Sequence, residues 1–401
     1  MALPPAEKLF MGLRRSIAVV RTAGADRGLQ GERTERFAGL DLLRGIAALA
    51  VLLIHSWPMP FSSWRPAFEN PFPRAYLAVD LFFVLSGFVI AHAYQSRLAS
   101  RAQFKQYCLA RLIRLYPLYC AATLLAAVEL LASLLLGHGV DPRVTSTHLL
   151  TSFATAILFL PTPSRWSVEP HLLFPLAFTA WSLLWELLVN LLFGLAAPRL
   201  GGFRLAGLAV IGAGLLGLAA LGHRSADLGG FWPGAWGGGA RALFSFFAGV
   251  AVFRFRQRYR GPSIPALLLV LLLLLVLIPG QFGGEIYDLA CIMFLFPLLV
   301  WLGTEAAMGP RLRSFALLAG YLSYPVYLLQ GPLLWAFPPI SARLHGALWS
   351  NAAREIAVQI YPAVVIACSW VVARRFDSPV RDGLRRRFLE RPPQTGAQTA
   401  P

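Results

Sequence analysis

Charged residues are scarce in this sequence. Only 14% of its 401 residues are Asp, Glu, Lys or Arg, whereas 57% are hydrophobic. A soluble domain cannot hide that much apolar surface, so the composition excludes an ordinary soluble protein and indicates a polytopic membrane protein. The formal net charge is +17, but most basic residues lie in short segments between apolar runs. That distribution is typical of cytoplasmic loops and argues against nucleic-acid binding.

Cysteine is also rare, and its spacing excludes two classes of small site. The four cysteines, at 108, 120, 291 and 368, form no C-x-x-C pair and no metal-ligand spacing. We therefore expect neither a disulfide framework nor a bound metal. The first 36 residues contain no apolar stretch ahead of a small-residue cleavage site. They predict a flexible cytoplasmic arm rather than a signal peptide.

What the sequence does contain is a series of long apolar runs. A helix of roughly 20 residues, rising 1.5 Å per residue, covers the hydrocarbon core of a bilayer. Ten runs fit that length, and a shorter one at 148–161 next to proline predicts a re-entrant or interfacial piece. The ten predicted spans are 39–57, 76–95, 112–137, 174–197, 203–222, 240–255, 263–279, 286–303, 315–337 and 354–373.

The distribution of arginine between these runs predicts the topology. With the N-terminus inside, the basic loops alternate with basic-poor ones, and the segment after the last run, "RRFDSPVRDGLRRRF", is strongly basic. Both termini are therefore expected in the cytoplasm, which requires an even number of spans. We predict an all-α fold of about ten transmembrane helices. It divides into an arm (1–36), a transmembrane domain (37–376) and a basic cytoplasmic tail (377–401) whose end is disordered.

The first predicted helix, "GLDLLRGIAALAVLLIHSW", carries three polar side chains on one face. Asp41 and Arg44 are three residues apart and can pair. His55 follows Arg44 by eleven residues, about three turns or roughly 16 Å along the axis. Charge inside a bilayer is costly, so this stripe is expected to face protein or water. The alternative is a packing histidine and an ion pair that reaches the membrane surface.

Arg111 and Arg114 form a second polar group, in "ARLIRLYPLY". They are three residues apart where a basic loop enters the third predicted helix. Two guanidinium groups on one face suit a phosphate, which they bind with paired charge-assisted hydrogen bonds. The alternative is that both are ordinary anchors at the cytoplasmic membrane surface.

Two further apolar runs contain polar residues. In "AWSLLWELLVNLLFG", Ser182, Glu186 and Asn190 recur every four residues and form one stripe, which is either functional or a set of hydrogen-bond partners for a neighbouring helix. In "AVDLFFVLSGFVIAHAY", Asp80 begins the second span. The Ser86–Gly87 pair lets backbones come close or lets the helix bend.

Together and in this order, the four stretches resemble the acyltransferase family 3 membrane proteins. "LDLLRGIAALAVLLIH" reproduces the family's opening pattern with its Arg-x10-His spacing. "DLFFVLSGF" at 80–88, "RLIRLYP" at 111–117 and "WSLLWE" at 181–186 match its next motifs. Weaker matches follow in "RALFSFFAGVAVFR", "LSYPVYLLQ" and "FDSPVR", so the resemblance spans about residues 36–385.

The resemblance implies transfer of an acyl group, usually acetyl, from cytoplasmic acyl-CoA to a hydroxyl of a carbohydrate-type acceptor. That acceptor would be a cell-surface polysaccharide or a lipid-linked glycan. The protein would lie in the inner membrane. Acyl-CoA would be a co-substrate, and no cofactor would be bound. His55 would be the general base, oriented by Glu186, or would itself become acylated. The implied donor-binding residues are Arg44, Asp41, Arg111 and Arg114. The implied supporting residues are Asp80, Ser86, Tyr116, Trp181, Ser182 and Asn190.

The sequence also departs from the family pattern. Gln330 stands where many relatives have a second histidine, and Asp377 stands where many have glutamate and is expected to pair with Arg381. The extra C-terminal esterase-like domain of many relatives is not expected here. A proton-coupled transporter is the alternative function, because the same intramembrane polar residues suit it. The absence of visible two-half symmetry argues against that alternative.

Overall fold

The fold was taken from a computed structural model, which describes residues 36–56, 71–136, 143–280, 282–345 and 351–390. Within these ranges the regular elements are helices, and no strand is present. The chain is thus an all-α polytopic membrane protein, as the composition predicts. The predicted N-terminal arm lies outside the described residues except for Arg36, and so does the chain after 390.

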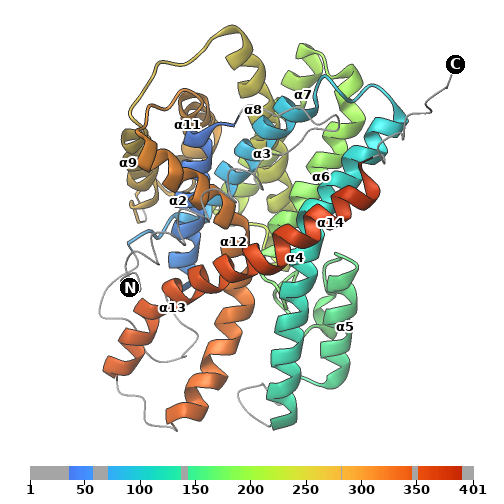
Figure 1. The fold of residues 1–401 in the computed structure, drawn as a ribbon, viewed down its shortest axis with the longest axis vertical. Helices are drawn as coiled ribbons and strands as arrows, with labels where there is room; N and C mark the ends of the chain where they lie inside the picture. Colours follow the sequence, from blue (N-terminus) through green and yellow to red (C-terminus); the bar gives the residue numbers. More distant parts are fainter. Residues whose placement is uncertain (1–35, 57–70, 137–142, 281, 346–350, 391–401) are drawn as a thin grey trace, which may run out of the picture.

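Figure 1 shows how the main helices are arranged. They are α2 (Ala38–Ser56), α3 (Ala78–Tyr94), α4 (Arg101–Leu136), α5 (Ser146–Ile157), α6 (Ala180–Ala196), α7 (Gly202–His223), α8 (Ala235–Arg258), α9 (Ala266–Leu277), α10 (Gly284–Ala290), α11 (Phe296–Gly303), α12 (Pro310–His345), α13 (Asn351–Val372) and α14 (Ser378–Phe388). Short 3-10 turns cover Ala75–Leu77, Ser164–Trp166, Ala197–Arg199 and Trp232–Gly234. Two π-helical turns, Cys291–Leu295 and Ala373–Asp377, join α10 to α11 and α13 to α14.

Each of the ten predicted spans coincides with a helix or, for 286–303, with the continuous α10–α11 segment. Among the described residues, seven helical segments are long and apolar enough to cross a membrane, and α9 is a shorter apolar helix. Two predicted starts were wrong. The helix predicted from 112 begins at Arg101. Its first turns are polar, and hydrophobic length alone does not identify polar turns as helical. The helix predicted from 174 begins at Ala180, since 174–179, which includes Pro175, forms turns.

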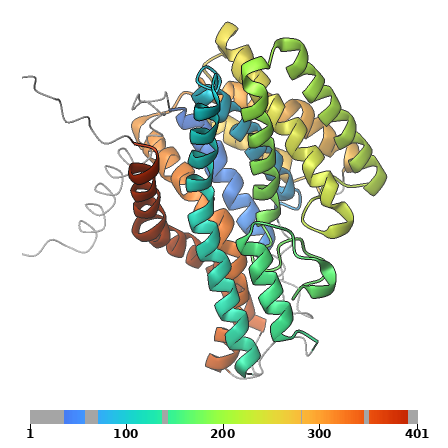
Figure 2. The ribbon, with the colours of Figure 1, turned by 90° about the vertical axis from the view of Figure 1, so that its right-hand side faces the viewer.

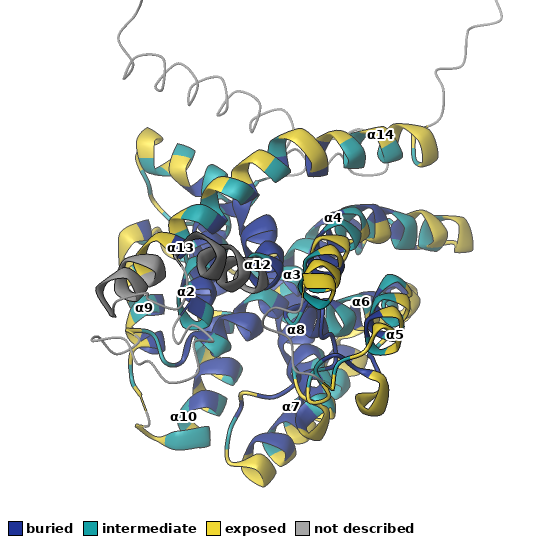
Figure 3. Cartoon of the chain, turned by 90° about the horizontal axis from the view of Figure 1, so that it is seen from below, coloured by how far each residue is buried: buried dark blue, intermediate teal, exposed yellow. Residues whose placement is uncertain are grey.

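The centre of the bundle is formed by α3 and α8, the two helices with the most enclosed surfaces (Figure 3). Their backbones approach closely at two glycines. A Cβ atom on Gly249 would lie 2.9 Å from the backbone nitrogen of Phe88, and one on Gly87 would lie 3.1 Å from the Cα atom of Phe246. The close approach that Ser86–Gly87 predicts is therefore confirmed, and α3 is held directly against α8.

A second close contact joins α2 to α12. Asp41, near the start of α2, lies against Gly320 of α12. His55, near the end of α2, contacts Gln330 of α12. Residue numbers increase together along both helices, so α2 and α12 run parallel. At the crossing, a Cβ atom on Gly45 would lie 2.9 Å from the carbonyl carbon of Ala319 and closer still to its methyl group. The glycine of the first motif therefore sets the spacing between these helices.

We expect Gly45→Ala to destabilise the protein by about 1–3 kcal/mol, the usual cost of forcing an extra methyl group into a packed contact. Gly217→Ala in α7 is the matched control, because a Cβ atom there meets nothing within 4 Å. Thermal unfolding midpoints of the two variants in detergent provide the measurement. Equal midpoints would show that the α2–α12 contact tolerates a side chain.

The C-terminal basic segment is helical rather than extended. Helices α13 and α14, with the π-helical turn between them, form one continuous rod across a face of the bundle (Figure 1). Figure 2 shows this rod beside α4, which it contacts. Tyr321 of α12 and Ser378 of α14 share a hydrogen bond between hydroxyl oxygens 2.8 Å apart. The basic residues of α14 are thus fixed next to the transmembrane helices.

Candidate active site

A cavity of about 980 Å³ lies between α2, α3, α4, α6, α12 and α14. Its lining on α12 extends from Pro310 to Tyr327, and its lining on α2 extends from the start of the helix to Arg44. These are the helix ends that the arginine distribution places in the cytoplasm. The cavity therefore begins at the predicted cytoplasmic end and reaches into the transmembrane region.

Positive charge dominates the cavity lining. Its seven arginines are Arg36, Arg44, Arg111, Arg114, Arg313, Arg381 and Arg385. Its three carboxylates are Asp41, Glu186 and Asp382. The lining carries an excess of four positive charges at neutral pH, which attracts an anion with several charges.

At the mouth of the cavity, Asp41 is held between two arginines. Arg44 Nη1 lies 3.6 Å from Asp41 Oδ1, so the pair predicted from their spacing is present. Arg36 Nε donates to Asp41 Oδ2 at 3.1 Å. Because one carboxylate is shared between two guanidinium groups, the three side chains together carry a net positive charge. The Asp41–Arg44 pair follows from helix geometry, because residues three apart on α2 are neighbours, whereas Arg36 reaches Asp41 from the segment before the helix.

On the opposite wall, α4 presents Arg111 and Arg114 to the cavity. Both guanidinium groups lie over tyrosine rings. Arg111 is 5.3 Å from the ring centre of Tyr94, and Arg114 is 5.0 Å from that of Tyr324. Stacking on aromatic faces holds a guanidinium plane in place. The spacing of three residues thus brings both groups to one site.

The amphipathic helix α14 closes this side of the cavity with Arg381 and Arg385. Arg381 Nη2 pairs with Asp377 Oδ2 at 2.9 Å, as the sequence predicts. Burial, followed by repulsion from Arg114, lowers the pKa of Arg381 to about 10. The guanidinium group remains charged at neutral pH, and its crowding with Arg114 would be relieved by a bound anion.

Deeper in the cavity, Glu186 of α6 and Ser86 of α3 face each other. Ser86 Oγ donates to Glu186 Oε1 at 2.7 Å, and both residues line the cavity. Ser182 lies one turn from Glu186 on the same face of α6, as the predicted stripe requires. Asn190 continues the stripe but lies outside the cavity lining. Its Oδ1 accepts a hydrogen bond from the hydroxyl of Tyr107.

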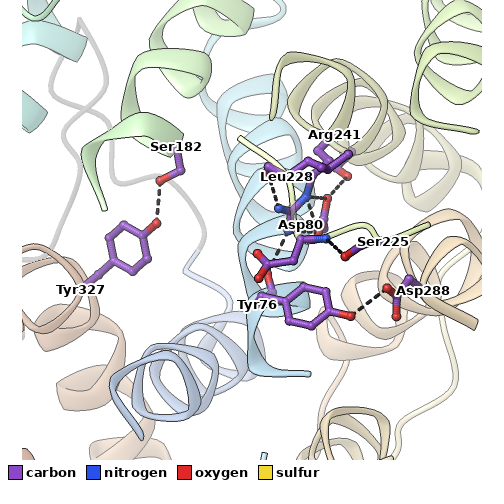
Figure 4. A network of polar contacts seen from close by, with 10 residues as sticks. Tyr76, Asp80, Ser182, Ser225, Leu228, Arg241, Asp288 and Tyr327 are labelled. Atoms are coloured by element: carbon purple, nitrogen blue, oxygen red, sulfur yellow. Dashed lines mark hydrogen bonds and ion pairs between the residues drawn. The ribbon is translucent and has the colours of Figure 1, made fainter. Parts of the chain in front are cut away.

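The inner end of the cavity is formed by Tyr327 and Ser182 (Figure 4). Their hydroxyl oxygens are 2.7 Å apart. Tyr327 Oη also donates to the carbonyl oxygen of Thr179 at 3.3 Å. This hydrogen-bonded layer joins α12 to the start of α6.

His55 is placed beyond this inner end and is not part of the cavity lining. Its Nδ1 lies 3.3 Å from Oε1 of Gln330, one turn after Tyr327 on α12. Its ring meets Phe178 edge-on, with centroids 4.8 Å apart. The partner of the imidazole is therefore Gln330, whereas Glu186 accepts its hydrogen bond from Ser86.

One predicted supporting residue, Asp80, belongs to a buried ion-pair network (Figure 4), and another, Trp181, lies beside it. Arg241 of α8 contacts both oxygens of Asp80, and both side chains are fully buried. Arg241 also donates to the carbonyl oxygens of Leu228 and Tyr76 and lies 5.4 Å from the ring of Trp181. Asp80 and Trp181 thus lie outside the cavity, in the contact between α3, α6 and α8.

Tyr116 is also placed away from the cavity. It is exposed, and its hydroxyl donates to the carbonyl oxygen of Ile157 at 2.5 Å, which joins α4 to α5. The family motif "RLIRLYP" therefore combines two cavity arginines with a tyrosine that connects neighbouring helices.

Sequence reasoning missed several cavity residues. The missed residues with basic side chains lie at helix ends or next to loops, and they are Arg36, Arg313, Arg385 and His92. Arginine is common at such places for topological reasons alone. Tyr324 and Tyr327 had a signal in "LSYPVYLLQ", since they are three residues apart and share one face of α12.

A family model described as an acyltransferase domain, that of acyltransferase family 3, matches residues 37–373. The chain is also 39% identical over 162 residues to "Protein 2 in picA locus" of Rhizobium radiobacter, a match that covers 39% of this chain and 80% of that relative. No solved structure matches. Because the family model covers nearly the whole transmembrane region, the chain belongs to acyltransferase family 3.

Proposed function

We propose that the protein is an O-acyltransferase of the inner membrane. It takes an acyl group, most simply acetyl, from cytoplasmic acyl-CoA and transfers it to a hydroxyl of a carbohydrate-type acceptor at the cell envelope. The observation that carries this proposal is the arginine-rich cavity at the predicted cytoplasmic end, in a chain of the acyltransferase family. CoA is a long donor with several phosphate charges, which that lining complements.

In this proposal the arginines bind the phosphates of the donor. Arg111 and Arg114 form one wall, Arg44 with Asp41 forms the other, and Arg381 and Arg385 add charge from α14. Each guanidinium group offers several N–H donors in a plane that matches phosphate oxygens. The exposed Arg258 and Arg260, at the end of α8 and just after it, add long-range attraction of the donor to this end of the protein.

The donor arm then extends past Glu186 and Ser86 toward Tyr327. Glu186 is placed to accept hydrogen bonds from the amide groups of this arm. His55 lies beyond the Tyr327–Ser182 layer that forms the inner end of the cavity, so the proposal requires this layer to open for the acyl end of the arm to reach the imidazole. The acceptor hydroxyl gives its proton to the imidazole while its oxygen attacks the thioester carbonyl carbon. The carbon–sulfur bond breaks, and the departing thiolate takes the proton from the imidazolium group.

We expect Arg114→Ala to raise the KM for acyl-CoA by about 10- to 100-fold, because a charge-assisted hydrogen bond contributes about 1.5–3 kcal/mol. Release of free CoA from membranes in the presence of acceptor is the measurement. It also separates an acyltransferase from a carrier, which would leave the thioester intact.

Arg311→Ala is the matched control for this prediction. Arg311 is exposed in the first turn of α12, at the same predicted cytoplasmic end, but does not line the cavity. The proposal expects an unchanged KM in this variant. Equal KM values for Arg114→Ala and the wild type would remove Arg114 from the donor site.

A further inference from the structure

The side chain of Gln330 has a defined orientation next to His55. It is fully buried on α12, and its Oε1 lies 3.3 Å from His55 Nδ1. Its Nε2 donates to the carbonyl oxygen of Tyr327 at 2.8 Å. Rotating the amide by half a turn would place two oxygens against each other at Tyr327, so the hydrogen bonds assign which amide atom faces the imidazole.

This orientation determines which nitrogen of His55 carries the proton. An amide oxygen only accepts hydrogen bonds, so the imidazole nitrogen that faces it must donate. A neutral imidazole has one N–H group and one lone pair. With the proton on Nδ1, the lone pair is on Nε2.

The plane of the ring is fixed as well. Phe178 meets the imidazole edge-on at an interplanar angle of 76°. The same phenylalanine closes over Gly331, where an added Cβ atom would lie 3.1 Å from its ring. One aromatic ring thus holds His55 against the helix that carries Gln330.

We propose that Gln330 is a positioning residue that holds His55 in the Nδ1–H form and thereby leaves Nε2 as the proton acceptor. This inference rests on the proposed role of His55 as general base. During acyl transfer Nε2 takes the acceptor proton and returns it to the sulfur of the departing CoA, while Nδ1 keeps its proton throughout. In serine hydrolases a carboxylate performs this orienting task, whereas here a neutral amide does so.

The kinetic test compares three variants. Gln330→Met removes the hydrogen-bond acceptor at similar volume and is expected to lower kcat by about 10- to 100-fold with little change in the KM for acyl-CoA, because the cavity arginines are untouched. Gln330→Glu, which burial keeps as the neutral acid, retains an oxygen facing Nδ1 and an O–H donor for the carbonyl oxygen of Tyr327, and is expected to retain kcat within a few-fold. Tyr361→Phe is the control, since Tyr361 Oη donates to the main-chain carbonyl oxygen of Gln330 and the substitution leaves the side-chain amide of Gln330 intact.

A spectroscopic test reads the tautomer without requiring activity. Protein with ¹⁵N-labelled histidine has seven labelled side chains, and the His55 signals are assigned by their loss in His55→Ala. We expect a protonated Nδ1 and an unprotonated Nε2 in the wild type and in Gln330→Glu. Gln330→Met is expected to shift this ratio toward Nε2–H.

The outcomes separate this inference from the proposed function. Full activity of His55→Ala would overturn the proposed role of His55 itself. An inactive His55→Ala together with a Gln330→Met variant of wild-type kcat and unchanged tautomer would overturn only the role of Gln330. If Gln330→Met does not fold, a wild-type protein with the proton on Nε2 of His55 overturns the inference by itself.

Discussion

Replacing His55 with alanine is expected to lower acyl transfer by about 10²–10⁴-fold, the range that a positioned general base contributes. The KM for acyl-CoA should change little. His55 lies beyond the inner end of the cavity, and the seven arginines of the lining stay in place. Loss of kcat with retained donor affinity is the signature expected for a group that acts on the reacting atoms and not on the distant phosphates.

Two measurements test the effect of this substitution. CoA release from membranes reports the rate, and the mass of the cell-envelope glycans reports whether the acyl group is added in the cell. His223→Ala is the control, because this exposed histidine at the end of α7 does not line the cavity. A His55→Ala variant that releases CoA at the wild-type rate would exclude His55 from the chemistry.

Replacing Arg241 with methionine is expected to destabilise the protein by about 3–5 kcal/mol, the usual cost of leaving one partner of a buried ion pair uncompensated. The carboxylate of Asp80 is fully buried and has Arg241 as its main partner. Methionine preserves the apolar stem of the side chain, so the loss reports the charge, together with the hydrogen bonds to the carbonyl oxygens of Leu228 and Tyr76, more than a cavity. A loss of this size is a large fraction of typical protein stability.

The double variant Asp80→Leu/Arg241→Met removes both charges and is the decisive comparison. It is expected to be more stable than Arg241→Met alone, because no unpaired carboxylate remains. Thermal midpoints and the fraction of monodisperse protein in detergent provide the measurement. If the single and double variants unfold together at the wild-type temperature, the ion pair does not stabilise the bundle.

The location of the helices could be predicted from the sequence because hydrophobic length is a local property. The runs around α3, α7 and α8 are bounded by loops that contain arginine, glycine or proline. The same criterion missed the first turns of α4 and all of α14, since both are rich in charge and read as loops. They are helical because they pack against other helices. The hydrophobicity of a single segment does not predict such packing.

The candidate site shows the same limit. Asp41–Arg44 was predicted because residues three apart on a helix are neighbours, whereas Asp377–Arg381 was predicted from the resemblance to the family's C-terminal motif. The hydrogen bonds from Ser86 to Glu186 and from His55 to Gln330 join residues 100 and 275 positions apart. Their pairing depends on which helices pack together, and that follows from contacts such as Gly45 on Ala319 rather than from either motif.

One consequence follows from the fact that Arg44 and His55 lie on a single unbroken helix. Eleven residues of α2 separate them, so the rise of the helix fixes the distance along its axis at roughly 16 Å. In the proposed reaction α2 therefore fixes the distance between the group that binds the donor and the group that takes the proton. A donor whose charged group binds at Arg44 must extend by about that length to present its acyl carbon to His55, which favours a carrier with a long arm and excludes a short acyl phosphate.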